Sequence, residues 1–264
     1  CDNLPSVECD AVIVATGGLS VPNTGSDGLG LRELARLGHV MNPAYAALTP
    51  LTATDSPFAC LSGLSLRVTI SARDDAARRT AASTGGFLFT HRGYSGPAVL
   101  DISHVAVRSR TESDGAARVT VRWTELDEAG WEKVLRPQGS RTLAAVVREH
   151  LPARLVDVLL ALADCNPMRS LAELRRDERH RVIDILTACV LPWDGDEGYK
   201  KAEVTGGGVD LGEINPVSME SRRHPGLYIC GEVLDAFGPV GGYNVLWAWA
   251  TGLAAGIGAS TSAQ

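Results

Sequence analysis

The stretch that decides the fold is residues 226–256, GLYICGEVLDAFGPVGGYNVLWAWATGLAAG. It opens with a short apolar run, which predicts a buried strand, and this strand ends at Gly231, where the missing side chain lets the backbone pass close to a ligand. Glu232 and Asp235 follow in the turn. A glycine-rich loop then leads into an apolar helix that we expect to begin near Asn244. This order of strand, acidic turn, glycine loop and helix indicates a unit that encloses a ligand.

The chemistry of this unit suits a flavin. The carboxylates of Glu232 and Asp235 can accept hydrogen bonds from ribityl hydroxyls. Gly238, Gly241 and Gly242 remove side chains from the loop, so its amide donors lie at the amino end of the helix, which favours negative charge. A reduced flavin carries its anionic charge at the pyrimidine edge of the ring, where such a helix end would stabilise it.

Three further residues are candidates for roles at the ring or in catalysis. Asn244 can offer a donor and an acceptor to the pyrimidine edge, or cap the helix, while Tyr243 can stack on the ring or donate a proton. His91 lies at a strand end in FTHRGYSGP, residues 89–97, and imidazole titrates near neutrality. We therefore take His91 and Tyr243 as catalytic candidates. The alternative for His91 is that it only bonds backbone groups of its turn.

The stretch 226–256 closely resembles the C-terminal flavin segment of the YhiN/BaiN-like family, which are FAD-dependent, or NAD(P)/FAD-dependent, oxidoreductases. Three further stretches agree with the family, namely AVIVATGGLSVPNTGSDGLG (11–30), FLFTHRGYSGPAVLDIS (87–103) and KAEVTGGGVDLGEINPVSMESRRHPGLYICGEV (201–233). The resemblance implies an α/β nucleotide-binding fold of the two-dinucleotide-binding-domain type, interrupted by an α+β insert. It also implies that Thr16, Gly17 and Gly18 line the path of FAD. The glycine run that contains Gly207 would approach the isoalloxazine or act as a hinge.

The periodicity along the chain agrees with that layout. Residues 10–15, DAVIVA, form a continuous apolar run, as expected for a parallel strand covered on both faces. From residue 49 to 124 apolar and polar residues alternate in short runs, which predicts antiparallel strands. From 141 to 192 the period becomes helical, with breaks at prolines. We therefore predict an FAD-binding domain in two parts, 1–48 and 201–264, around an insert domain, 49–200.

One family feature is missing from this sequence. The family opens with a strand and a G-x-G-x-x-G turn that holds the FAD pyrophosphate, and no stretch here supplies it. The cluster Gly25–Gly30 follows a Pro-Asn-Thr loop instead of a strand, so we interpret it as a helix-entry turn. The chain begins at Cys1 without an initiator Met. We expect a fragment, or a product that lacks the adenosine-binding half.

The resemblance implies an enzyme that moves hydride between FAD and a small or medium organic substrate, with NAD(P)H as electron donor. Reduction of an activated carbon–carbon double bond and oxidation of an amine or amino-ketone both stay open. The alternative is a truncated, non-catalytic remnant, or a fragment that binds flavin only with a partner. A third hypothesis is an interaction protein that uses the β-rich insert.

The amino-acid composition limits the classes of partner that we expect this chain to bind. With 45% hydrophobic residues the chain can bury a substantial core, and its net charge of −6 with dispersed Lys and Arg predicts no nucleic-acid partner. The six cysteines show neither C-x-x-C spacing nor a zinc-ligand pattern, which disfavours disulfide reductase chemistry and a metal site. No uncharged apolar run reaches about 18 residues, and no signal peptide opens the chain. We expect a soluble cytoplasmic protein with a small-molecule substrate and no membrane contact; no pattern indicates its oligomeric state.

Overall fold

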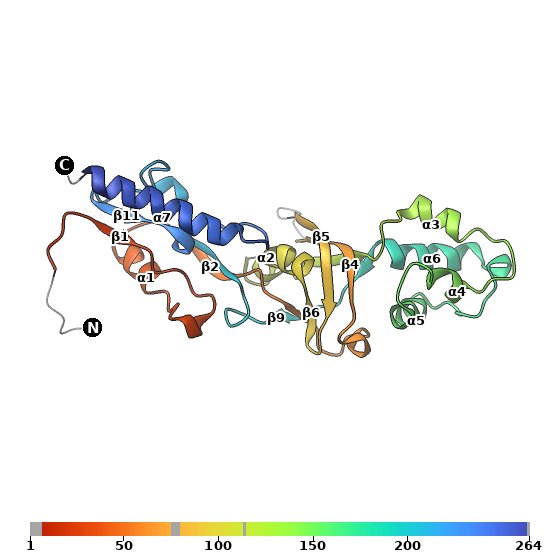
Figure 1. The fold of residues 1–264 in the computed structure, drawn as a ribbon. Helices are drawn as coiled ribbons and strands as arrows, with labels where there is room; N and C mark the ends of the chain where they lie inside the picture. Colours follow the sequence, from red (N-terminus) through yellow and green to blue (C-terminus); the bar gives the residue numbers. More distant parts are fainter. Residues whose placement is uncertain (1–6, 75–79, 113–114, 263–264) are drawn as a thin grey trace. The chain divides into compact units, whose positions relative to one another are not determined.

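The computed structural model describes residues 7–74, 80–112 and 115–262, and its ribbon is drawn in Figure 1. The chain forms two compact units. Unit 1 combines residues 1–48 with 198–264, and unit 2 is residues 49–197. The second unit thus ends at residue 197, against the boundary at 200 expected from the sequence.

The described residues of unit 1 form two small sheets and two α-helices. Strand β1 (Val12–Val14) pairs in parallel with β11 (Leu227–Ile229), and β2 (Met41–Ala47) pairs antiparallel with β10 (Val204–Val209). The helices are α1 (Leu29–Arg36) and α7 (Tyr243–Ser262). Single 3-10 turns are η1 (Pro22–Thr24), η4 (Leu211–Glu213) and η5 (Gly231–Val233). The parallel pairing of β1 and β11, far apart in sequence, agrees with a Rossmann-like arrangement.

The core of unit 1 lies around β11. Tyr228 and Ile229 are fully buried, and they belong to one apolar cluster with Leu34 of α1 and Val209 of β10. Tyr228 also donates a hydrogen bond from its hydroxyl to the carbonyl of Gly258, at 3.2 Å, which ties β11 to the last turns of α7.

One expectation about unit 1 is wrong within the described residues. Strand β1 is not covered on both faces, because Val12 and Ile13 are 47% and 43% exposed. On helix α7, an added Cβ at Gly252 or Gly256 would meet nothing within 4 Å among the described residues. The close approach occurs at Gly258, whose Cβ would lie 2.6 Å from the carbonyl of Ser218.

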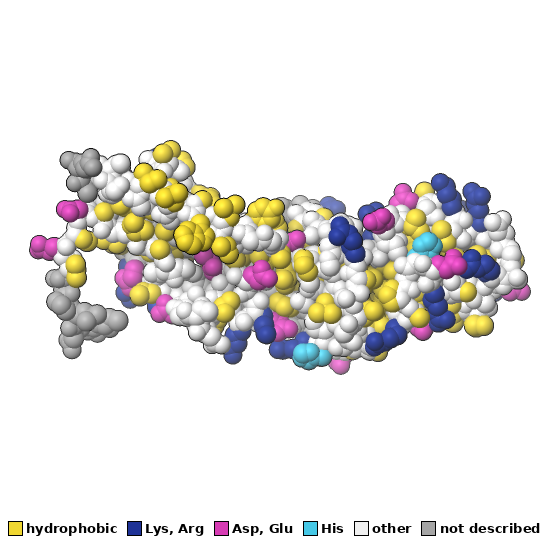
Figure 2. Space-filling model, viewed as in Figure 1, with side chains coloured by type: hydrophobic (Ala, Val, Ile, Leu, Met, Phe, Trp, Pro, Cys, Tyr) yellow, Lys and Arg dark blue, Asp and Glu magenta, His cyan; other side chains and the backbone are white. Residues whose placement is uncertain are grey.

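The outward side of α7 is apolar. Hydrophobic side chains gather over this helix in Figure 2. Leu246, Trp249 and Leu253 are 65%, 73% and 67% exposed. Within the described residues, no helix combines the length and the hydropathy that crossing a membrane requires.

Unit 2 is built on a seven-stranded sheet in the order β8-β7-β4-β5-β6-β3-β9, with antiparallel pairing throughout. Its strands are β3 (Leu51–Thr52), β4 (Ser65–Arg73), β5 (Thr80–Phe89), β6 (Gly93–Ser95), β7 (Arg118–Arg122), β8 (Cys189–Val190) and β9 (Gly195–Asp196). The long strands β4, β5 and β7 follow the alternation read from the sequence, because apolar positions of period two all point to one face.

That apolar face is covered by α2 (Pro97–Glu112), a helix that lies inside the range 49–124, over which the alternation of the sequence predicts strands. Its first residue is a proline, which suits the first helical position because its missing N–H needs no partner there. The core beneath holds an aromatic cluster, in which the rings of Phe87 and Phe89 meet edge to face with centroids 4.8 Å apart. Trp123 and Tyr94 complete it and are also buried.

Among the described residues, four helices follow in the second half of unit 2. They are α3 (Glu128–Val134), α4 (Leu143–Val147), α5 (Ala153–Leu162) and α6 (Arg176–Thr187), with the 3-10 turn η3 (Leu171–Glu173) between α5 and α6. A further 3-10 turn, η2 (Ala59–Leu61), lies in the first half, between β3 and β4. Asp127 and Thr142 cap α3 and α4 by accepting backbone N–H bonds, and α5 starts directly after Pro152. The helical period read over 141–192 thus agrees with three of these helices, and α3 lies before that range.

Candidate functional site

The end of β11 places Glu232 where the sequence predicts a ligand contact. Its Oε1 accepts a hydrogen bond from the backbone N–H of Thr205, at 2.9 Å, and another from the hydroxyl of Ser20, at 2.7 Å. The other carboxylate oxygen, Oε2, accepts no hydrogen bond from the described residues. Because two neighbours hold Oε1, the half-buried side chain is fixed in orientation and can offer Oε2 to a ligand hydroxyl.

Thr205, at the start of β10, is the residue that sequence reasoning missed here. Its buried hydroxyl oxygen accepts hydrogen bonds from the N–H groups of Leu19, at 2.7 Å, and Ser20, at 3.0 Å. These bonds tie the turn after β1 to the second sheet. The available signal was its position directly before the glycine run at 206–208, but residues 19 and 205 are too far apart in sequence for the pairing to be foreseen.

Because Gly18 has no side chain, the turn after β1 can pack directly against Thr205 of β10 and the carboxylate of Glu232. A Cβ at this buried position would lie 2.4 Å from Oγ1 of Thr205 and 2.6 Å from Oε1 of Glu232. Any side chain would therefore push this hydrogen-bonded cluster apart. The predicted cofactor residues Thr16, exposed, and Gly17, half-buried, come directly before it in the same turn.

Asp235 and Gly207 form a second link between the predicted residues. The N–H of Gly207 donates to Oδ1 of Asp235 at 3.1 Å. Gly207 lies at a bulge in β10 with φ of 78°, and a Cβ there would meet the carbonyl of Pro43 at 2.2 Å. This glycine therefore serves close packing of β10 on β2, and its amide fixes one oxygen of the half-buried Asp235.

The glycine loop ends differently from the expectation for Asn244. Helix α7 begins at Tyr243, so Asn244 lies inside the first turn and is not the cap residue. Its side-chain amide spans the loop: Oδ1 accepts from the N–H of Gly238 at 2.8 Å, and Nδ2 donates to the carbonyl of Gly238 at 3.0 Å. Gly241 and Gly242 are exposed, and Tyr243 is exposed beside them.

Helix α7 is also pinned to the strand end. The N–H of Gly231 donates to the hydroxyl of Thr251 at 2.9 Å, and the indole N–H of Trp247 donates to the carbonyl of Gly231 at 3.2 Å. Both polar groups of this glycine are therefore satisfied by the helix. The amino end of α7 is consequently held next to the acidic turn.

Between these elements lies a pocket of about 240 Å³. It is lined by Glu203, Val204, Glu232, Ala236, Phe237, Asn244, Val245, Trp247, Ala248 and Trp249. Ligand pockets for whole small molecules usually measure about 300–1,000 Å³. A hollow of this size therefore suits one part of a dinucleotide, and its aromatic walls and carboxylate acceptors suit a planar ring with an attached chain that carries hydroxyl groups.

His91 lies in unit 2, at the exposed turn between β5 and β6. Thr90 holds this turn: its N–H donates to the carbonyl of Gly93 at 2.8 Å, and its hydroxyl accepts from the N–H of Arg92 at 3.2 Å. His91 makes no hydrogen bond to the described residues, so holding the loop is not its role in the part of the chain that is described. Its assignment as a catalytic residue stays a prediction.

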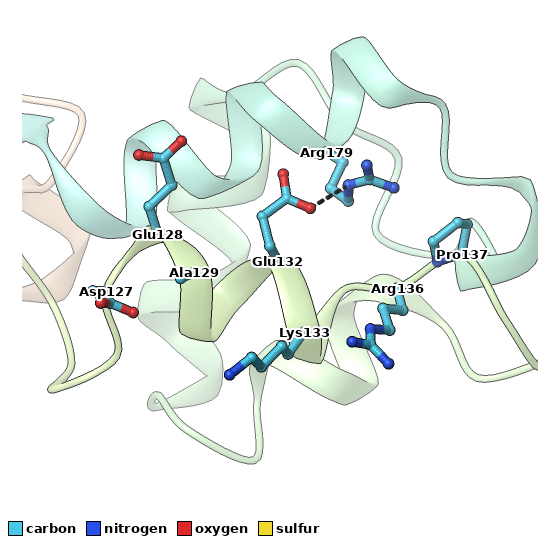
Figure 3. A pocket seen from close by; sticks show the side chains of 8 residues that line it. All are labelled: Asp127, Glu128, Ala129, Glu132, Lys133, Arg136, Pro137 and Arg179. Atoms are coloured by element: carbon cyan, nitrogen blue, oxygen red, sulfur yellow. Dashed lines mark ion pairs between the residues drawn. The ribbon is translucent and has the colours of Figure 1, made fainter.

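A larger hollow of about 750 Å³ lies between α3 and α6 in unit 2 (Figure 3). Glu132 points toward Arg179 there and forms an ion pair with it at 3.1 Å. Lys133 and Arg136 also line the hollow, and none of the described residues that line it is aromatic. Its exposed, charged walls do not suit a flavin ring, so we place the candidate cofactor site in unit 1.

Comparison with known proteins identifies relatives along nearly the whole chain. Residues 1–258 match the HI0933-like protein Rossmann domain. The chain is 36% identical over 249 residues to the ribosomal RNA dihydrouridine synthase of Escherichia coli, covering 93% of this chain and 60% of that protein. It is 36% identical over 255 residues to the Haemophilus influenzae protein of the same name, covering 96% and 61%. It is 33% identical over 257 residues to the 3-dehydro-bile acid delta(4,6)-reductase of Clostridium scindens, covering 95% and 62%.

The chain therefore spans about 60% of the length of these curated relatives. The family match and these relatives confirm the resemblance seen in the sequence motifs. The chain belongs to the HI0933-like Rossmann domain family.

Proposed function

We propose that this chain is the flavin-binding part of a reductase that adds two hydrogens across an activated carbon–carbon double bond, with FAD as cofactor and NAD(P)H as electron donor. The observation that carries the proposal is Glu232. Its Oε1 is fixed by Thr205 and Ser20, and its Oε2 accepts no hydrogen bond from the described residues, beside a pocket with aromatic walls.

The residues at the site fit a flavin. Glu232 offers a free acceptor, and Asp235 has only Oδ1 engaged by the described residues, so both carboxylates can accept ribityl hydroxyls. The exposed Gly242 and Gly241 leave the first-turn amides of α7 open to an anionic ring edge. Bound FAD would supply a two-electron carrier that takes up hydride and passes it on to the substrate carbon.

The chain's own residues would then bind and orient the flavin and protonate the substrate. Glu232 and Asp235 hold the ribityl chain, and the half-buried Trp247 provides an apolar wall. The hydroxyl of Tyr243, exposed at the start of α7, is the group we assign to donate a proton to the substrate. His91 is the second candidate for that proton.

The double bond as target is supported by the names of the relatives. One acts on uridine in ribosomal RNA to give dihydrouridine, and another reduces the delta(4,6) bonds of a 3-dehydro bile acid. Uracil and a 3-oxo steroid with such bonds share one chemical feature, a carbon–carbon double bond conjugated to a carbonyl. This common feature favours reduction over amine oxidation for the present chain.

Flavin binding by matched variants tests the proposal. In Glu232→Gln, the amide oxygen can still accept from Thr205 and Ser20, so the fold should persist, but the charged acceptor facing the ligand is lost. A hydrogen bond to a charged group contributes about 1.5–3 kcal/mol, so flavin affinity should fall roughly 10- to 150-fold. Glu33→Gln is the control, because Glu33 lies on α1 and pairs with Arg36 at 2.6 Å.

The measurement is quenching of flavin fluorescence on titration of the full chain with FAD, with circular dichroism to check folding. Equal affinities of Glu232→Gln and Glu33→Gln would contradict the site. Oxidation of NADH or NADPH by the flavin-loaded chain, in the presence of a conjugated enone, then tests the reductase assignment separately.

The alternative is that flavin binds only together with a further polypeptide. The exposed apolar side of α7 favours it, because single soluble domains rarely expose several large apolar residues together. In that case the folded chain, incubated with FAD and then separated from free FAD, is colourless. Colour should then appear once the part of the Escherichia coli relative that this chain does not match is supplied as a separate polypeptide.

A further inference from the structure

The outer face of the large sheet in unit 2 carries an unusual set of side chains. Strands β4 and β7 alternate, so that Val68, Ile70 and Ala72 are buried while the residues between them point the other way. Those outward positions include four arginines: Arg67 and Arg73 on β4, and Arg118 and Arg122 on β7.

The register brings the arginines together in pairs. Arg73 lies directly opposite Arg118, and Thr69 lies directly opposite Arg122. Arg67 is two residues from Thr69 on β4, which makes it the diagonal neighbour of Arg122. Like charges directly opposite on neighbouring strands, such as Arg73 and Arg118, repel each other, and an anion that lies against them would relieve this repulsion.

Nothing on the described face neutralises these charges. None of the residues of β4, β5 and β7 is Asp or Glu. Within the described residues the four arginines form no ion pair, and the only side-chain hydrogen bond of Arg122 is a long one, from Nη2 to the hydroxyl of Thr69 at 3.5 Å. Its Nε is buried without a hydrogen-bond partner in the described part of the chain. By contrast, Arg141 and Arg148 of the same unit pair with Glu149 and Asp157.

Hydroxyl groups fill the space between the arginines. Thr69 bonds to Thr84 of β5 at 2.9 Å, and Ser71 bonds to Thr120 of β7 at 2.8 Å. On β5 the outward positions of Ala82 and Gly86 are small and exposed, so this side of the face is flat. Arginine and hydroxyl donors on an open surface are the groups that contact phosphate oxygens and sugar hydroxyls in nucleic acids.

We propose that the outer face of β4, β5 and β7 binds the phosphate backbone of single-stranded RNA. The inference rests on the proposed function, since the RNA would present the uracil whose double bond is reduced. A base must leave its stack before chemistry can reach its ring atoms, which favours a single strand over a duplex. No aromatic side chain points outward from the three strands, so the face positions RNA without reading its sequence.

The number of arginines on this face determines how strongly RNA binding should depend on salt concentration. Arg67 and Arg73 are six residues apart on one strand, which corresponds to about 20 Å. With four phosphate contacts, the logarithm of the association constant should fall with the logarithm of salt concentration with a slope of about −2.8, using about −0.7 per contact for single strands. Removing two contacts should halve the slope and weaken binding roughly 25-fold at 0.1 M salt.

The test is fluorescence anisotropy of a labelled oligouridine with the full chain over a range of salt concentrations. Arg67→Gln with Arg122→Gln should show the halved slope and weaker binding. The control is Arg141→Gln with Arg148→Gln, which removes the same charge from the same unit and should bind like the wild type. Arg73→Gln with Arg118→Gln should weaken binding as much while leaving the melting temperature no lower, because a repulsive pair is removed.

Equal losses in both arginine pairs and in the control would overturn the proposal, because they would report net charge alone. Absence of RNA binding by the folded wild type would also overturn it. So would binding of vesicles containing an anionic phospholipid with no binding of oligouridine. The flavin titration is measured independently of RNA binding. The RNA-binding proposal can therefore fail while the flavin-site proposal holds, and the two results can be distinguished. The sequence-based expectation of no nucleic-acid partner predicts the opposite result of the same measurement.

Discussion

The substitution Gly18→Ala tests the site at its most crowded point. The added Cβ would lie 2.4 Å from Oγ1 of Thr205 and 2.6 Å from Oε1 of Glu232. Real Cβ atoms do not approach other heavy atoms this closely, so the turn or the two side chains must move. Movement of Thr205 also strains the two hydrogen bonds that its hydroxyl accepts from Leu19 and Ser20.

These contacts determine how much the free energy of unfolding should change in Gly18→Ala. Overpacking of a buried site by one carbon destabilises by about 1–3 kcal/mol, and weakening two hydrogen bonds adds about 1 kcal/mol, so the free energy of unfolding should fall by about 2–4 kcal/mol. With a urea dependence of about 2 kcal/mol per molar, the unfolding midpoint of unit 1 should drop by about 1–2 M. Affinity for FAD should fall as well, because Glu232 loses its fixed orientation.

Gly252→Ala is the matched control, with the same chemical change in the same unit. A Cβ there meets nothing within 4 Å, and the residue lies inside α7. Alanine is favoured over glycine in a helix by about 1 kcal/mol, so this variant should be more stable than the wild type. The assay is hydrogen exchange in urea, measured on peptides from each unit, since two compact units need not unfold together. An unchanged midpoint for Gly18→Ala would refute the reasoning.

Two further predictions concern unit 2. Hydrogen bonds from Thr54 and Thr52 lower the pKa of Asp194 to about 2, from 3.8, so its contribution to stability is complete above about pH 4 and is lost as the pH falls toward 2. Asp194→Asn should therefore remove part of the acid dependence of unit 2 in thermal melts between pH 5 and 2; an identical pH profile would contradict this. Burial raises the pKa of the Cys189 thiol to about 12, whereas Cys60 is exposed. Iodoacetamide at pH 8 should label Cys60 and spare Cys189 in mass spectra of the native protein, and equal labelling would show that the core opens.

Local patterns predicted the long elements well. Alternation within residues 49–124 predicted antiparallel strands, and β4 and β7 show it because one face of each is buried and the other is solvated. The sequence after residue 226 predicted a strand, an acidic turn, a glycine-rich loop and a helix, and the structure contains these elements in this order. These features depend on neighbours in the sequence, which a single sequence displays.

Local sequence patterns did not predict the pairings between residues that are far apart in the sequence. Strand β2 reads MNPAYAA, with no alternation, and is held by pairing with β10 more than 150 positions along the chain. The apolar face of β4 and β5 is covered by α2, whose mixed surface gave no clear helical period. Thr205 likewise acquires its role only through contacts with residues 19 and 20. Burial of an element depends on what packs against it, and that partner is not visible locally.

The net charge of a chain does not determine whether one of its faces can bind nucleic acid. A charge of −6 averages over both units, whereas a ligand meets one face. The period-two pattern already places Arg67 and Arg73 on the same side of one strand. Only the register adds Arg118 and Arg122 beside them, and only the pairing shows that no carboxylate of these strands lies between. The local charge of a sheet face is therefore a property of strand pairing, and a chain that is acidic as a whole can still present a cationic surface to a polyanion.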